Sequence, residues 1–162
     1  MIQLSSEPQV YDFPRFGSLA VAPEDEIAFP WGLPGFSNLK RWAVLTLAPT
    51  DRFLWLQSLE DLSVALPICD PWAVFEDYEP KLPAYAKAAL ELESSDDFVI
   101  MGIVVVTKDA GEMTMNLLAP LVMNLRKHIG RQITLEGTDY SVRTPIPRVT
   151  GGTESLEEAA VS

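Results

Sequence analysis

Hydrophobic residues in the first half of the chain occur in short runs separated by turn-forming residues. The runs are rich in β-branched and aromatic side chains, which is typical of strands joined by turns. Ten of the 13 prolines lie within the first 83 residues, and they exclude long helices there because proline lacks a backbone donor. Pro67 inside the last run predicts an edge strand or a bulge. The predicted strands are Ser18–Val21, Glu26–Phe29, Trp42–Leu47, Phe53–Gln57 and Ser63–Cys69.

A single helix is predicted at Pro83–Glu93, where alanine, leucine, lysine and glutamate dominate and proline occupies a first-turn position. Apolar residues recur there at spacings of three and four, which predicts one narrow stripe packed against a sheet. The residues of this stripe are Leu82, Tyr85, Ala89 and Leu92.

The second half returns to strand-like runs, with short hairpin connections predicted at Lys108–Gly111 and Gly137–Asp139. About ten short strands and one short amphipathic helix indicate a mainly β fold, a small antiparallel β-barrel-like single domain. We expect this domain to span residues 1–146 and a flexible acidic tail to follow at 147–162. The strands predicted here are Phe98–Lys108, Met113–Leu118, Leu121–Arg126, Gln132–Glu136 and Tyr140–Arg143.

Charge and cysteine content narrow the classes of function. The 162 residues carry a formal net charge of −11, so the protein repels polyanions, and we expect no direct contact with nucleic acid or anionic membranes. The one cysteine, Cys69, cannot form an internal disulfide, and the first residues do not resemble a secretory signal. The longest apolar run, Phe98–Val106, is too short to span a membrane as a helix. We therefore expect a cytoplasmic protein.

The sequence contains few candidates for catalysis. With one histidine, His128, and one cysteine, a nucleophile and base would have to be these two residues in contact. We interpret His128 as a solvated loop residue and Cys69 as a small buried hydrophobe. No nucleotide or metal motif is present, and we expect no cofactor and no metal. Asn116 and Asn124 flank an apolar segment and are predicted to tie strand ends to neighbouring backbone.

The segment Asp70–Pro80 places the three aromatic residues Trp72, Phe75 and Tyr78 among four acidic ones. Aromatic anchors surrounded by charge suit a protein interface, because the rings supply contact area and the charges steer association. The alternative is that the rings close the open end of a barrel and the acids are simply solvated. Composition alone leaves both interpretations open.

Five blocks of the sequence, in this order, resemble the FliW flagellar assembly factors. The resemblance covers about residues 12–146, and the ordered spacing of the blocks makes it more specific than any block alone. The blocks are Phe29–Phe36, Trp55–Ser58, Asp70–Pro71 leading to Asp77–Glu79, Asn116–Asn124, and Gly130–Ile133 ahead of Tyr140 and Arg143.

The resemblance implies a β-barrel-like fold, no enzymatic activity and two partners, the RNA-binding translational regulator CsrA and flagellin. While flagellin is bound, the protein would be unable to bind the regulator. After flagellin is exported, the freed protein would bind the regulator and relieve its repression of flagellin translation. The protein would not compete directly with RNA for the regulator. We expect a monomer. The alternatives are a flagellin export chaperone without regulator binding, and a small-molecule-binding β-barrel or small hydrolase, which needs a pocket with convergent polar groups.

The predicted partner-binding residues are acidic, apart from one tyrosine. Glu79 is the first choice, because the Asp-Tyr-Glu match is close and its charge lies where the aromatic segment ends. The others are Asp77, Glu76, Glu60, Asp61 and Tyr78.

Overall fold

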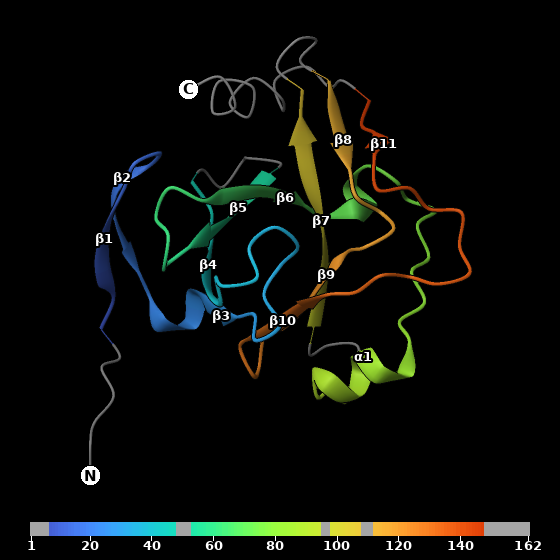
Figure 1. Cartoon of the computed structure of the whole chain (residues 1–162), viewed down its shortest axis with the longest axis horizontal. Coiled ribbons are helices and arrows are strands. Elements are labelled where there is room, and N and C mark those ends of the chain that lie inside the picture. Colours follow the sequence, from blue (N-terminus) through green and yellow to red (C-terminus); the bar gives the residue numbers. More distant parts are fainter. Residues whose placement is uncertain (1–6, 48–52, 95–97, 108–111, 148–162) are drawn as a thin grey trace.

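The computed structural model describes residues 7–47, 53–94, 98–107 and 112–147 (Figure 1). Seven of the described strands close into a ring in the order β3-β4-β5-β6-β7-β9-β10, since β10 pairs with both β3 and β9 and β9 also pairs with β7. All neighbours in this ring are antiparallel except β3 and β10. The predicted mainly β, barrel-like fold is confirmed. The ring strands are β3 (Glu26–Ala28), β4 (Arg41–Leu45), β5 (Phe53–Ser58), β6 (Ala65–Cys69), β7 (Phe98–Val106), β9 (Leu121–Asn124) and β10 (Ile129–Gln132).

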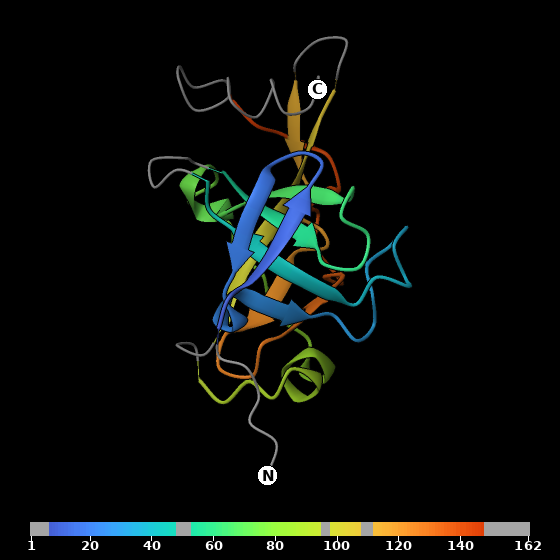
Figure 2. The same cartoon turned by 90° about the vertical axis from the view of Figure 1, so that its left-hand side faces the viewer.

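The other elements surround this ring. The hairpin of β1 (Gln9–Phe13) and β2 (Gly17–Val21) forms a separate sheet on one side of the molecule (Figure 2). At the opposite side in Figure 1, α1 (Ala84–Ala89) lies below the sheet, and the far half of β7 extends beyond the ring to pair with β8. The remaining elements are β8 (Met113–Met115), β11 (Thr144–Pro145) and the 3-10 turns η1 (Pro23–Asp25) and η2 (Pro71–Ala73).

Alternating positions of the ring strands point to the two faces of the sheet. Trp42, Leu56, Ile68 and Met123 belong to one fully buried cluster that receives side chains from several ring strands and fills the barrel interior. The positions between them form a second apolar layer beneath the β1–β2 hairpin and the segment after β6. The barrel is therefore a packed core with apolar layers on both faces of its wall.

The helix is shorter than predicted, and its buried face differs. α1 ends where Glu91 adopts a positive φ of 53°, so the predicted stripe cannot continue along one helical face. The buried residues are Ala86 and Leu90, four positions apart, whereas Tyr85 is 48% exposed. Leu82 and Leu92 lie outside the helix but are partly buried and pack against the cluster of Ala86 and Leu90, so Tyr85 is the residue of the predicted stripe that the structure exposes.

Pro67 does not lie in an edge strand, because β6 has β5 on one side and β7 on the other. β7 pairs only with Ile68 and Cys69, however, so Pro67 pairs with Trp55 of β5 alone. The missing backbone donor is thus placed where the strand has a single neighbour.

Three further predictions differ from the structure. β1 was not predicted, because its polar and apolar residues do not alternate and it has only one buried residue, Phe13. Residues 133–136 and 140–143 form no strand ladder, although the N–H groups of Ile133 and Leu135 donate to the carbonyls of Pro120 and Leu118. Consequently Gly137, with a φ of 68°, turns an irregular segment rather than a hairpin. The turn predicted at 108–111 and the tail from residue 148 lie outside the described residues.

Candidate functional site

The segment from Asp70 to Pro80, which we call the aromatic loop, leaves the barrel where β6 ends. Pro71 begins η2, and the Asp70 carboxylate caps this turn by accepting a hydrogen bond from the Trp72 N–H at 3.0 Å. The N–H of Phe75 donates to the Pro71 carbonyl at 2.7 Å. These local bonds turn the chain away from the sheet immediately after β6.

Tyr78 anchors the aromatic loop to the body of the protein. Its ring is 3% exposed and lies edge-on to Tyr140, with ring centroids 4.8 Å apart. Its hydroxyl donates to the Leu117 carbonyl at 2.7 Å. Burial raises the pKa of Tyr78, so the hydroxyl stays protonated and keeps this donor role. Tyr78 was predicted to bind a partner, but the structure buries it as a support.

Two further contacts fix the exposed part of the aromatic loop. The Trp72 indole N–H donates to the Tyr78 carbonyl at 2.8 Å, and its ring remains 40% exposed. The Tyr140 hydroxyl accepts from the Glu79 N–H at 2.9 Å. These two hydrogen bonds fix the conformation of the loop, and the Trp72 ring stays partly exposed on its surface.

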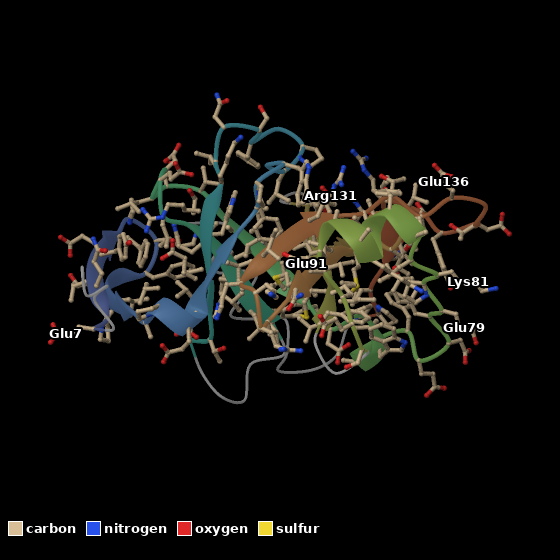
Figure 3. All side chains as sticks on the ribbon, turned by 90° about the horizontal axis from the view of Figure 1, so that it is seen from below. Glu7, Glu79, Lys81, Glu91, Arg131 and Glu136 are labelled. Atoms are coloured by element: carbon tan, nitrogen blue, oxygen red, sulfur yellow. The ribbon has the colours of Figure 1, made fainter. Side chains whose placement is uncertain are left out.

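The acidic residues Glu76, Asp77 and Glu79 on this loop are all exposed. Figure 3 shows Glu79 at the end of the molecule opposite Glu7, near Lys81 and on the same side as Glu136. The structure supports the covering role for Tyr78, and a protein interface at the exposed residues stays a prediction. Tyr78 covers the barrel wall, while the carboxylates and Trp72 face outward and are available for contact.

A groove of about 620 Å³ lies between the aromatic loop and β7. The loop contributes Asp70, Trp72, Tyr78, Glu79 and Pro80, and the strand contributes residues 98–101. Its volume falls within the range of natural ligand sites. The groove thus combines apolar walls with two carboxylates, which are next to the exposed indole ring.

The remaining predicted residues, Glu60 and Asp61, occupy the turn between β5 and β6, at the other end of β6. The Glu60 carboxylate accepts from the N–H groups of Lys40 and Arg41 at 2.5 and 2.9 Å, and these bonds hold the pKa of Glu60 below its usual value. The Asp61 carboxylate accepts from the hydroxyl and the N–H of Ser63, which lowers its pKa as well. The Asp61 carboxylate therefore stabilises its own turn, and the Glu60 carboxylate joins this turn to the start of β4.

The structure thus divides the six predicted residues between two places. Glu76, Asp77, Tyr78 and Glu79 share the aromatic loop, whereas the β5–β6 turn is separated from it by the length of β6. Sequence reasoning did not identify Tyr140 as part of the site. Its contacts with Tyr78 and Glu79 span about 60 residues, and no local pattern encodes them.

Other sequence interpretations concern structural roles. Asn116 accepts from the Ala119 N–H at 2.9 Å, and Asn124 donates to the Leu90 carbonyl at 2.7 Å, so both tie strand ends to the backbone as predicted. Cys69 is fully buried, as predicted. His128 is half-buried rather than solvated: its φ is 56° and its Nδ1 lies 3.1 Å from the Glu26 carbonyl oxygen.

A second cavity of about 400 Å³ opens at one end of the barrel. Apolar interior residues line most of it, and its polar lining residues, Glu24, Asp25 and Thr46, belong to η1 and the end of β4. Within the described ranges, no three His, Cys, Asp or Glu side chains are grouped to hold a metal ion. Among the same residues, none of the helices has the length and apolar character needed to span a membrane.

Comparison with known proteins adds independent information. The family model described as FliW protein matches residues 11–146. The flagellar assembly factor FliW of Clostridium tetani is 34% identical over 130 residues, which cover 80% of this chain and 90% of that relative. The corresponding factor of Desulfitobacterium hafniense is 40% identical over 129 residues, covering 80% and 85%.

A crystal structure of the flagellar assembly factor FliW has the same fold as this chain. The TM-score is 0.79 at 27% sequence identity, and the alignment covers 86% of this chain and 98% of the crystal structure's chain. Three kinds of comparison therefore give the same family: the family model, the two relatives and the crystal structure. Each of them covers most of the chain. The chain therefore belongs to the FliW family of flagellar assembly factors.

Proposed function

We propose that this protein is a non-enzymatic cytoplasmic regulator that binds a CsrA-type translational regulator and flagellin in alternation. Flagellin holds the protein while it is abundant. After flagellin is exported, the freed protein binds the regulator and relieves its repression of flagellin translation. Membership in the FliW family supports the role in flagellar assembly, and the exposed carboxylates of Glu76, Asp77 and Glu79 support the choice of a basic partner.

One observation carries the proposed binding mode. On the aromatic loop, Glu76, Asp77 and Glu79 are exposed, as is the ring of Trp72. The hydrogen bond of the buried Tyr78 to Leu117 fixes the loop to the rest of the protein. A site whose conformation exists before binding loses little conformational entropy when the partner arrives. Tryptophan is enriched among the residues that dominate protein interfaces.

The charge of the protein is consistent with this partner. A protein that grips messenger RNA needs positive charge to neutralise phosphates, and this chain carries a net charge of −11. Opposite charges accelerate encounter and exclude partners of the wrong sign. We infer that the aromatic loop, with its exposed carboxylates, docks beside the RNA site of the regulator and weakens RNA binding without occupying that site.

Titration of labelled RNA against the regulator, at several fixed concentrations of this protein, tests the mechanism. We expect the protein to lower the maximal fraction of RNA bound, even when the RNA is in excess. Complete recovery of binding at high RNA concentration would instead show direct competition for the RNA site. Failure to affect RNA binding at any concentration contradicts the proposed regulation.

The alternative of a flagellin export chaperone shares the acidic and aromatic surface but predicts a different set of partners. Pull-down from native cell extract, with the partners identified by mass, separates the two. Recovery of flagellin without a small basic RNA-binding protein favours the chaperone. We favour a small-molecule barrel less, because the polar lining residues of the 400 Å³ cavity, Glu24, Asp25 and Thr46, are all exposed and its remaining lining is apolar.

A further inference from the structure

β7 changes its neighbours along its length, and this determines where its backbone groups point. The Ile103 carbonyl accepts from the Asn116 N–H at 2.9 Å, so the backbone groups of Ile103 face the side of β8 and β9. Successive residues of a strand direct their N–H and C=O groups to opposite edges. The backbone groups of Phe98, Ile100 and Gly102 therefore face the other edge, where β6 lies.

β6 covers only a small part of that edge. Cys69 pairs with Gly102, and then Asp70 and Pro71 turn the chain into η2. Beyond this point β7 continues as Met101 to Phe98 with β9 on one side. The groove occupies the other side, and within the described residues the aromatic loop supplies no hydrogen-bond partner for the backbone of Ile100.

An open strand edge is a template for another strand, because its N–H and C=O groups lack a ladder partner. The groove places this edge beside the exposed ring of Trp72 and the apolar surface of Pro80, with the carboxylates of Asp70 and Glu79 at the same site. These features are the components of peptide recognition by strand addition, in which the backbone supplies affinity and side-chain pockets supply specificity.

We propose that the groove binds an extended peptide segment, which continues the line of β6 and pairs with Ile100. Alternate side chains of the segment pack on Trp72, and a lysine or arginine of the segment faces Asp70 and Glu79. The negative charge of the groove selects this basic segment over an acidic one. The inference deepens the proposed function and rests on it for the view that the segment belongs to a partner protein.

The test uses the full chain and a random dodecapeptide library displayed on phage. We expect the recovered peptides to alternate apolar residues and to contain a basic residue. The tightest of them, made synthetically, should protect the Ile100 amide from hydrogen exchange. Two N-methylated forms of that peptide, one methylated at its odd and one at its even residues, keep the side chains but remove backbone donors. The form that loses the donors facing β7 should bind roughly tenfold more weakly or worse.

Two matched variants test the groove walls. Trp72→Ala should weaken the synthetic peptide roughly tenfold, whereas Trp31→Ala, which removes a tryptophan that is 45% exposed outside the groove, should change binding less than about twofold. Recovery of no peptide overturns the proposal. So does a peptide that binds both variants equally and leaves the Ile100 amide unprotected.

The outcome is independent of the pull-down that tests the proposed function. Peptide binding in the groove without capture of flagellin or the regulator would contradict the proposed partners and leave strand addition supported. Capture of both proteins without peptide binding or Ile100 protection would contradict strand addition alone.

Discussion

Acidic residues lie at both ends of β6, but their carboxylates make different contacts. At the start of β6, the carboxylates of Glu60 and Asp61 accept hydrogen bonds from backbone N–H groups and a serine hydroxyl. At its end, Glu76, Asp77 and Glu79 are exposed on a loop that other residues hold. All five residues are exposed, but only the carboxylates of the first turn are bonded to the backbone: Asp61 within its own turn, and Glu60 at the start of β4.

Other side chains fix the backbone in both turns, so the difference lies in whether a backbone N–H group is placed within reach of the carboxylates. In the aromatic loop that task falls to Tyr78, Trp72 and Tyr140, through rings and hydroxyl groups. In the β5–β6 turn, the Gln57 amide and the Ser58 hydroxyl fix the backbone. The Asp61 carboxylate accepts from Ser63 within that turn, and the Glu60 carboxylate accepts from N–H groups at the start of β4. Substitutions in the two turns should therefore separate stability from binding.

The largest effect is expected from Tyr78→Ala, which removes the anchor of the aromatic loop. Truncation of a large buried aromatic ring costs on the order of 3–5 kcal/mol in the free energy of unfolding. Denaturant unfolding measures this loss. The control Tyr85→Ala, on a ring that is 48% exposed, should cost less than about 1 kcal/mol. An equal loss in both variants would contradict the anchoring role.

Tyr78→Phe tests the hydroxyl group separately from the ring. The Leu117 carbonyl loses its donor, and an unsatisfied buried acceptor costs about 1–3 kcal/mol. Unfolding measured at two wavelengths, or by two probes, gives the loss and checks that unfolding stays cooperative. Stability equal to that of the original protein would mean that water or a shifted donor replaces this bond.

Glu79→Lys should weaken regulator binding about tenfold while thermal stability changes little, because exposed charges contribute to association more than to folding. Titration calorimetry gives the dissociation constant. Glu136→Lys makes the same change in net charge at the same end of the molecule and serves as the control (Figure 3). An equal loss in the two variants would assign the effect to the overall field rather than to the aromatic loop.

Glu60→Gln should alter the pH dependence of stability and leave regulator binding unchanged. The N–H groups of Lys40 and Arg41 lower the pKa of Glu60 in the folded protein, so its ionised form stabilises the fold above about pH 4.5. This contribution is lost as the pH falls through the folded pKa. Thermal midpoints of the variant and the original should therefore converge in acid; a constant difference across pH 3–7 argues against the role.

Much of the fold was predictable because strands of a packed β domain have local signatures. Trp42–Leu47 and Phe53–Gln57 contain alternating or continuous apolar residues, and each includes most of an observed strand. β1 was not predictable, because its sequence has no alternation of apolar and polar residues, which matches the burial of Phe13 alone. The segment at 133–136 has strand-like residues but finds single hydrogen bonds instead of a ladder.

The candidate site was predictable in composition and not in arrangement. The exposed position of Glu79 and the aromatic character of its neighbours follow from the sequence. The burial of Tyr78 depends on Leu117 and Tyr140, which are distant in the chain. The capping role of Glu60 depends on the N–H groups of Lys40 and Arg41, which the pairing of β4 with β5 brings to it.

The amino-acid sequence by itself determined the short strands, the absence of long helices in the first half, the strong negative charge and the order of the blocks shared with the FliW family. These properties come from side-chain type and spacing along the chain. Only the tertiary structure decided which carboxylates are held by the backbone and which edge of β7 stays open. Closing the barrel brings residues that are distant in the sequence together. A carboxylate or backbone carbonyl is therefore hydrogen-bonded only where the fold places a donor beside it.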